Sequence, residues 1–239
     1  MILLLALAIA PGIAISIFIY FLDKYDKEPL SLLVKSFLLG CLCTVFPLLL
    51  QLLAVNNGIK LDPSNTWQTF SYSFIIIGFS EEFAKFGILL IYPFRKKAFN
   101  EPYDGIVYSV MIGMGFATAE NVAYVLEFGA RTAVVRMFLS IPAHACFAII
   151  MGYFIGLAKF VNKEKSLLLA QGIIWPVLLH GGFDFFLLLD KGAYLLIGSL
   201  FILFVATRLS IKAVRRHREI STYLHHKNAY NERKDDYIF

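Results

Sequence analysis

Two adjacent glutamates and a lysine lie where the chain is expected to cross a membrane. Glu81, Glu82 and Lys85 belong to an otherwise apolar run from about residue 70 to residue 92, long enough to span a bilayer as a helix. Each ionisable side chain at that depth costs about 2.5–3.5 kcal/mol on insertion scales. Helical spacing places Lys85 beside both carboxylates, at i, i+4 from Glu81 and at i, i+3 from Glu82. A structural ion pair accounts for one carboxylate only, so the pattern favours a site that does chemistry.

Three later apolar segments carry further polar residues. These are Glu120 and Asn121 in 105–127, His144 in 133–158, and His180 and Asp184 in 166–189. Taken singly, each has a structural explanation. His144 could bond a carbonyl freed by Pro142, Asp184 could orient His180 at i, i+4, and the Glu120–Asn121 pair could link helices. No inexpensive structural explanation covers all of them together.

This set of side chains suits the hydrolysis of an amide bond. Carboxylates, imidazoles and an amide supply a base for water, an acid for the leaving group and a donor for an oxyanion. Either Glu81 or Glu82 is the expected base, with Lys85 holding the other carboxylate ionised. His180, oriented by Asp184, is expected to act as a second acid or base or to bind the oxyanion. Three further residues are expected to line the pocket, namely His144, Glu120 and Asn121.

Other chemistries remain open at this point. His and Glu are zinc ligands, but the HExxH motif is absent and no ligand pair has zincin spacing, so the sequence leaves a metal undecided. Ser80, in Gly-Phe-Ser-Glu, is a weak candidate for a nucleophile. A proton-coupled transporter could use the same carboxylate–histidine relay, although neither an inverted repeat nor a matching pair of broken helices is evident.

Composition places the chain among integral membrane proteins. It has 239 residues, of which 59% are hydrophobic and 16% charged, against about 25% charged in soluble domains. Seven apolar segments predict an all-α, polytopic transmembrane bundle of about seven helices: 2–22, 31–55, 70–92, 105–127, 133–158, 166–189 and 193–212. Residues 1–214 would form one transmembrane domain and 215–239 a polar cytoplasmic tail. The net charge of +5 lies in the loops and the tail, so no nucleic-acid partner is expected.

The distribution of Lys and Arg predicts the orientation. Alternate connections are rich in these residues, for example Lys24 with Lys27, and the run 95–97, whereas the intervening ones are poorer. The positive-inside rule then puts the N-terminus outside and the C-terminus in the cytoplasm. At 1.5 Å per residue, Glu81 lies about 16 Å below the outer surface and His144 at a similar depth, while Glu120 and His180 lie at about 10–14 Å. These residues can therefore meet in one cavity.

Several motifs together resemble the PrsW family of bacterial membrane proteases. They are Glu-Glu-Phe-Ala-Lys at 81–85, Tyr-Asp-Gly-Ile-Val-Tyr at 103–108, Gly-Phe-Ala-Thr-Ala-Glu-Asn at 115–121, Ala-His-Ala at 143–145 and Leu-Leu-His-Gly at 178–181. The resemblance runs from about residue 25 to residue 185. In the wider, glutamate-dependent superfamily that includes the CAAX prenyl endopeptidases, the second motif ends in His, where this chain has Glu120.

The resemblance implies a function, a location and a partner. A PrsW-like chain would be a multi-pass protease of the bacterial plasma membrane. Its substrate would be a single-pass membrane protein, an anti-sigma factor, cut first on its extracytoplasmic side to begin regulated proteolysis in a stress response.

Overall fold

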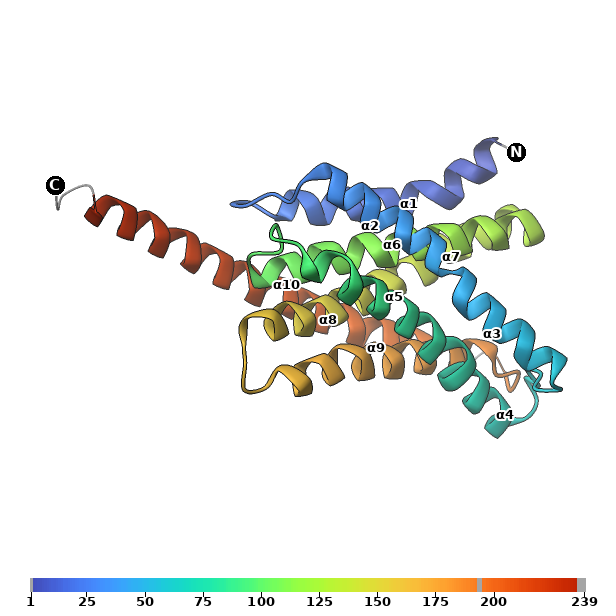
Figure 1. Ribbon diagram of the computed structural model, residues 1–239. Coiled ribbons are helices and arrows are strands. Elements are labelled where there is room, and N and C mark those ends of the chain that lie inside the picture. The colour runs from blue at the N-terminus through green and yellow to red at the C-terminus, as the bar shows by residue number, and fades with distance from the viewer. Residues whose placement is uncertain (1, 193–194, 236–239) are drawn as a thin grey trace.

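The computed structural model describes residues 2–192 and 195–235, and the side chains of residues 3–192 and 195–227. Throughout these ranges the regular structure is helical, which confirms the expected all-α class (Figure 1). In chain order the elements are α1 Ile2–Leu22, α2 Leu30–Cys43, α3 Val45–Asn56, α4 Thr66–Ser71, η1 Tyr72–Phe79, α5 Ser80–Ile91, η2 Pro93–Arg95, α6 Pro102–Phe128, α7 Ala130–Phe138, α8 Ser140–Phe160, α9 Lys165–Leu188 and α10 Leu195–Asp235.

Six helical stretches of the described chain are long and apolar enough to cross a membrane. They are Leu3–Leu22, Leu30–Asn56, Pro102–Phe128, Ala130–Phe160, Lys165–Leu188 and Leu195–Lys227. The seventh expected segment, 70–92, is helical too, but it is divided among α4, the π-helical turns of η1 and α5, which follow one another without a gap. Two of the other stretches also contain a break, at Thr44 between α2 and α3 and at Leu139 between α7 and α8.

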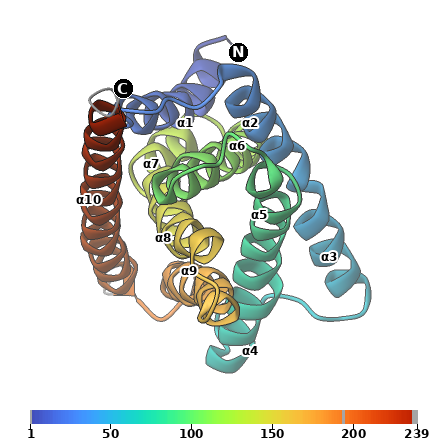
Figure 2. The same cartoon turned by 60° about the vertical axis from the view of Figure 1, so that its left-hand side comes forward.

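Helix α6 forms the centre of the bundle. Within its most apolar window 78% of the residues are buried, against 22% for α1 and 17% for α10. It lies among α1, α2, α5 and α8 (Figure 2). Its closest neighbour is α8, and Gly105 makes this approach possible because a Cβ there would collide with the backbone of Gly152 and Gly156. Small residues let helix backbones pack closely in a membrane, where dispersion replaces the hydrophobic effect.

Helix α10 continues past the expected end of the transmembrane domain. The chain remains helical from Arg215 to Asp235, and part of this stretch packs against the bundle. His217 stacks on Tyr153 with ring centroids 4.5 Å apart, and the Ser221 hydroxyl donates to Glu101 Oε1 at 2.9 Å. The start of the polar tail is therefore an ordered extension of α10, whereas the last four residues, 236–239, lie outside the described part.

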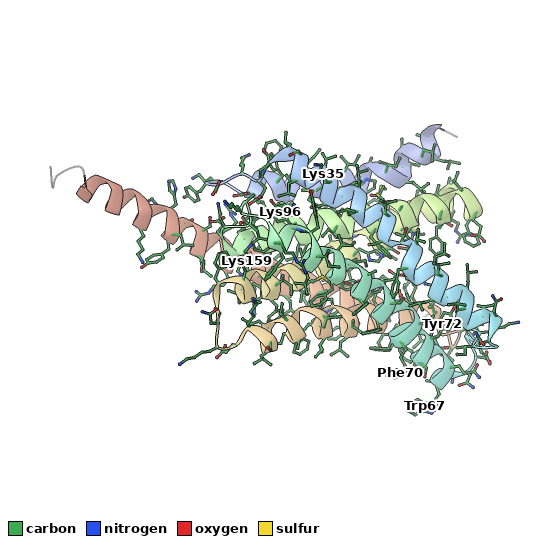
Figure 3. All side chains as sticks on the ribbon, viewed as in Figure 1. Lys35, Trp67, Phe70, Tyr72, Lys96 and Lys159 are labelled. Carbon is green, nitrogen blue, oxygen red and sulfur yellow. The ribbon has the colours of Figure 1, made fainter. Side chains whose placement is uncertain are left out.

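The two ends of the bundle differ in character. Lys35, Lys96 and Lys159 lie toward one end, and Trp67, Phe70 and Tyr72 lie toward the other (Figure 3). Basic residues concentrate on the cytoplasmic side of membrane proteins, and aromatic residues concentrate at the interfaces. This separation agrees with the orientation predicted from the sequence, which remains a prediction.

Candidate active site

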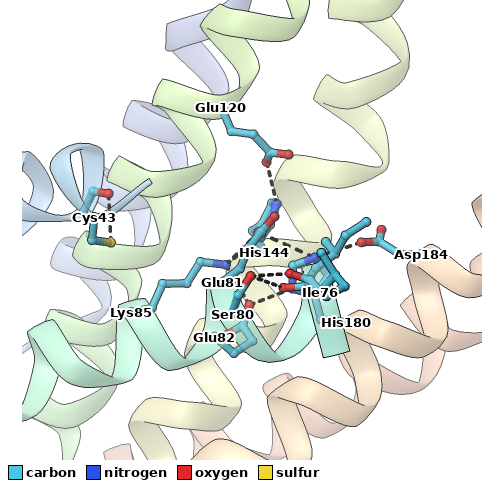
Figure 4. Close-up of polar contacts among 12 residues, drawn as sticks. Cys43, Ile76, Ser80, Glu81, Glu82, Lys85, Glu120, His144, His180 and Asp184 are labelled. Atoms are coloured by element: carbon cyan, nitrogen blue, oxygen red, sulfur yellow. Dashed lines mark hydrogen bonds and ion pairs between the residues drawn. The ribbon is translucent and has the colours of Figure 1, made fainter. Parts of the chain in front are cut away.

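The glutamate pair occupies the first turn of α5, inside the protein. Glu81 is 4% exposed, Glu82 is fully buried, and both carboxylates lie beside Lys85 (Figure 4). Lys85 Nζ donates to Glu82 Oε1 at 2.7 Å and lies 3.7 Å from Glu81 Oε2. Both expected pairings therefore occur, and the shorter one joins Lys85 to Glu82.

The backbones of η1 and α9 lie very close together beside this turn. A Cβ on Gly78, one turn before the glutamates, would lie 3.0 Å from the backbone nitrogen of Gly181. Glycine at both positions removes the side chains that would hold η1 and α9 apart. His180, the neighbour of Gly181, consequently reaches Glu82, and its Nδ1 lies 2.8 Å from Glu82 Oε1.

His180 is enclosed by carboxylates on both ring nitrogens. Nδ1 faces Glu82, whereas Nε2 lies 3.3 Å from Asp184 Oδ2 and 3.8 Å from Glu81 Oε2. Each nitrogen can donate a hydrogen bond when the ring carries two protons. Asp184 contacts His180 as the spacing predicts, but the shortest contact of this imidazole is with Glu82.

His144 enters the same cluster from α8. Helix α8 begins just after the break at Leu139, so Pro142 lies in its first turn. Proline is tolerated there because the backbone N–H groups of a first turn have no partner within the helix. Lys85 Nζ lies 3.1 Å from His144 Nδ1, and Glu120 Oε2 lies 3.0 Å from Nε2. Because a lysine ammonium can only donate, Nδ1 accepts and the ring proton sits on Nε2, from where it is donated to Glu120.

Arg136 on α7 is the member of this network that the sequence did not assign to the site. Its Nη2 lies 2.8 Å from Glu120 Oε2, and its Nε donates to Asn121 Oδ1 at 3.0 Å. Its guanidinium also lies over the ring of Tyr124, 4.1 Å from the centroid. An arginine inside an apolar run calls for a partner, so the sequence carried a signal, although not the identity of that partner.

Asn121 does not line the pocket, contrary to expectation. Its side chain is fully buried, and its amide donates to the carbonyl of Ala8 on α1 at 2.9 Å while accepting from Arg136. Both ends of the amide are thus used in holding α1, α6 and α7 together. This residue therefore supports the packing around the site from a position outside the cavity.

The cluster borders a cavity of about 520 Å³. Of the residues singled out in the sequence, five line it: Glu81, Glu120, His144, His180 and Asp184. Four helices that are distant in sequence supply these side chains, as the depth estimates predict. Glu82 and Lys85 lie behind this wall and contact the cavity only through their neighbours. Of the two adjacent glutamates, Glu81 is therefore the one that faces the cavity.

The serine nucleophile considered from the sequence finds no support in the geometry. The Ser80 hydroxyl donates to the carbonyls of Ile76 and Ile77, one turn back in its own helix, which leaves it poorly placed as a nucleophile.

Comparison with known proteins assigns the chain to a family. The family described as PrsW family intramembrane metalloprotease matches residues 28–209. The chain belongs to the PrsW family. Similar proteins named Protease PrsW come from Geobacillus kaustophilus, 38% identical with 77% of this chain and 80% of that one covered, and from Bacillus subtilis, 37% identical with 77% and 82% covered. A third, from Clostridioides difficile, is 37% identical, with 78% and 80% covered. No solved structure matches the chain.

Membership in the PrsW family, together with the apolar helices, identifies a membrane-embedded peptidase. It also identifies a multi-pass protein of bacterial membranes. This outcome favours the protease over the transporter, the alternative that the sequence left open.

The family description implies a metal, and the residues of this PrsW member fit one. Glu81, His144 and His180 each offer a ligand atom within 4.8 Å of the others, and Glu81 Oε2 is buried without a hydrogen-bond partner among the described residues. Two histidines and a glutamate form a donor set that Zn²⁺ uses in peptidases. Glu82 and Glu120 contact the two imidazoles, as outer carboxylates do around zinc.

The charge of the cluster agrees with this fit. With both imidazoles neutral, four carboxylates face two basic side chains, which leaves two negative charges unmatched; the residues are Glu81, Glu82, Glu120 and Asp184, with Lys85 and Arg136. A divalent cation, or protons on the imidazoles, would restore neutrality in a setting where unpaired charge is costly. In the described arrangement Lys85 Nζ is the cationic group beside His144 Nδ1.

Proposed function

We propose that this protease hydrolyses a peptide bond of a single-pass membrane protein, an anti-sigma factor, with Glu81 as the base that activates water. The observation that carries the proposal is the free oxygen of Glu81. This carboxylate lines the cavity, and its Oε2 accepts no hydrogen bond from the described residues. A general base must be able to reach water and take its proton, which Glu82, held by Lys85 and His180, is not placed to do.

The other residues divide the remaining work. Glu81 removes a proton from water, the hydroxide adds to the carbonyl carbon, and the carbonyl electron pair moves to oxygen. His180 Nε2, which faces the cavity between Glu81 and Asp184, donates to that oxyanion. When the C–N bond breaks, the proton held by Glu81 passes to the leaving amine. Lys85 keeps Glu82 ionised, and Glu82 in turn orients His180.

A bound metal would change two of these roles, because Glu81 and His180 Nε2 would then be its ligands. A divalent cation held by Glu81, His144 and His180 would polarise the scissile carbonyl and acidify a bound water. Glu81 is required with or without it.

The residues that line one end of the cavity support a location for the cut. Tyr124, Glu127 and Phe128, at the end of α6, line it together with Arg136 of α7. With the orientation predicted from Lys and Arg, this end is extracytoplasmic. Water reaches the site by the shorter route from that side, which supports a cut on the extracytoplasmic side of the substrate or just within the outer leaflet. An extended segment suits the site, because the amides of a helix are already paired internally.

Cleavage of a co-expressed anti-sigma factor tests the proposal. We expect the wild type to release a fragment, and mass spectrometry to place the new terminus on the extracytoplasmic side; Glu81→Gln should accumulate normally and release none. Cysteines near Asn65 should react with an impermeant thiol reagent from outside the cell, and cysteines near Ala98 should not. Fragments that end on the cytoplasmic side, or inverted labelling, would overturn this placement.

A further inference from the structure

One wall of the cavity is a helix that is otherwise at the edge of the bundle. Thr44 and three residues of α3, Pro47, Leu48 and Gln51, line the cavity at the spacing i, i+3, i+4, i+7, so they share one face. The opposite face of α3 is apolar and open, with Leu49 54% and Leu53 56% exposed. Such a face is suited to contact with lipid chains.

The opposite wall belongs to α6, and the two walls do not pack together. Ala123, Tyr124 and Glu127 of α6 line the cavity across from α3. Helix α3 packs on α5 and η1, whereas α6 packs mainly on α1, α2 and α8. Both ribbon views show α2 beside α6 and α3 diverging from it beyond the break at Thr44 (Figures 1 and 2). The space between α3 and α6 therefore leads from the periphery of the bundle to Glu81.

Gln51 is the unusual residue on this path. It is the one polar residue of α3 before its last residue, Asn56. It faces the cavity, and within the described part of the chain its amide makes no side-chain hydrogen bond. A primary amide has both a donor and an acceptor, which matches the N–H and C=O of an extended peptide. A peptide that leaves helical form near the bilayer needs such partners.

From these observations we infer that the substrate's transmembrane segment enters sideways between α3 and α6, and that Gln51 binds its unpaired backbone next to Glu81. This inference rests on the proposed function and adds a route and a binding residue to it. The occupant is a protein segment because the space is continuous with the base that cuts a peptide bond. The apolar residues at its outer edge suit the substrate's side chains, and Gln51 suits its backbone.

Photo-crosslinking tests the route with a control on the same helix. A benzophenone amino acid replaces Leu48 or Gln51 on the cavity face, and Leu49 or Leu53 on the lipid face, in the Glu81→Gln background that retains uncut substrate. The probe is the anti-sigma factor that the wild type cuts. We expect crosslinks to it from positions 48 and 51 at least fivefold above those from 49 and 53.

A crosslinker at Trp175 tests whether the substrate enters at a different place. A cavity of about 640 Å³ between α8, α9 and α10 is lined by Trp175 and Leu209 and contains none of the proposed catalytic residues. Crosslinks mainly from Trp175, or equally from both faces of α3, would overturn the inference. If no anti-sigma factor were cut by the wild type, the proposed substrate would fail instead, so the two failures are distinguishable.

Kinetics test the role of Gln51. Gln51→Leu keeps the size of the side chain and removes both hydrogen-bonding groups, so KM should rise about 3- to 10-fold, the equivalent of one or two lost hydrogen bonds. The matched change Leu49→Ala, on the lipid face, should leave KM within about twofold. An unchanged KM for Gln51→Leu, with normal accumulation, would remove Gln51 from the binding path.

Discussion

Replacing the two adjacent glutamates one at a time should separate catalysis from stability. Glu81→Gln removes the proposed base and, because Oε2 lacks a hydrogen-bond partner in the described structure, breaks no hydrogen bond at that atom. Loss of a general base lowers the rate by about 10²–10⁴-fold, or roughly 3–5 kcal/mol of transition-state free energy. The free energy of unfolding should change little, because Gln has nearly the same shape and is neutral.

Glu82→Gln should act mainly on stability. Glu82 Oε1 is 2.7 Å from Lys85 Nζ and 2.8 Å from His180 Nδ1, and the carboxylate is fully buried. Removing one partner of a buried pair costs about 3–5 kcal/mol. We expect the lower end, about 3 kcal/mol, because Lys85 retains Glu81 at 3.7 Å. For a chain of this length that corresponds to roughly 6–12 °C in Tm.

The assay combines thermal unfolding in detergent with cleavage of the co-expressed substrate by each variant. Glu164→Gln, an exposed carboxylate in the connection before α9, is the matched control and should change neither quantity. Cleavage by Glu81→Gln at the wild-type rate would show that Glu81 is not the base. Unfolding of Glu82→Gln at the wild-type temperature would show that the contacts of Glu82 with Lys85 and His180 do not stabilise the fold.

Three further predictions concern other parts of the protein. Arg136→Gln leaves His144 as the remaining close partner of Glu120. The cleavage rate, normalised to protein accumulation, should therefore fall about 10–100-fold. Arg136→Lys should give an intermediate rate. A chelator such as 1,10-phenanthroline should abolish cleavage and added Zn²⁺ should restore it; undiminished cleavage in metal-free buffer would assign Glu81 the role of base alone. Burial, and then the negative charge of Glu101, raise the pKa of Asp23 to about 7, so the folded state holds a proton that the unfolded state has released. Stability from this group is complete below about pH 4 and is lost as the pH rises through about 7; Tm should therefore fall between about pH 4 and pH 7, and less so in Asp23→Asn.

The overall fold could be predicted from the sequence because membrane helices are limited by simple rules. The expected segments 2–22 and 166–189 differ by at most one residue from α1 and α9 at each end. An apolar run of that length admits one structure in a bilayer, and charged connections mark its ends. The break at Thr44 could not be predicted in this way, because the chain is equally apolar on both sides of it. The wide turns of η1 likewise lack a signal in composition.

Less of the site could be predicted, because most of its contacts join residues that are far apart in the sequence. Pairs within one helix follow from spacing, as for Lys85 with Glu82. The contact between His180 and Glu82 joins residues 98 positions apart, and depth estimates give their height in the membrane but not their rotation about the helix axis. The same limit explains why Asn121 was expected in the pocket, although its amide is bonded to Ala8. Rotation is set by packing, at positions such as Gly78 and Gly181.

The ion pair between Lys85 and Glu82 has a consequence for the order of events during synthesis. Helix α5 leaves the ribosome long before α9, so the Glu82 carboxylate must enter the bilayer while His180 has not yet been made. Lys85, three residues away in the same helix, is available at once and neutralises the carboxylate during insertion. When α9 arrives, His180 joins a pair that is already formed. Lys85 can therefore neutralise Glu82 within a single helix, before any contact with α9 exists.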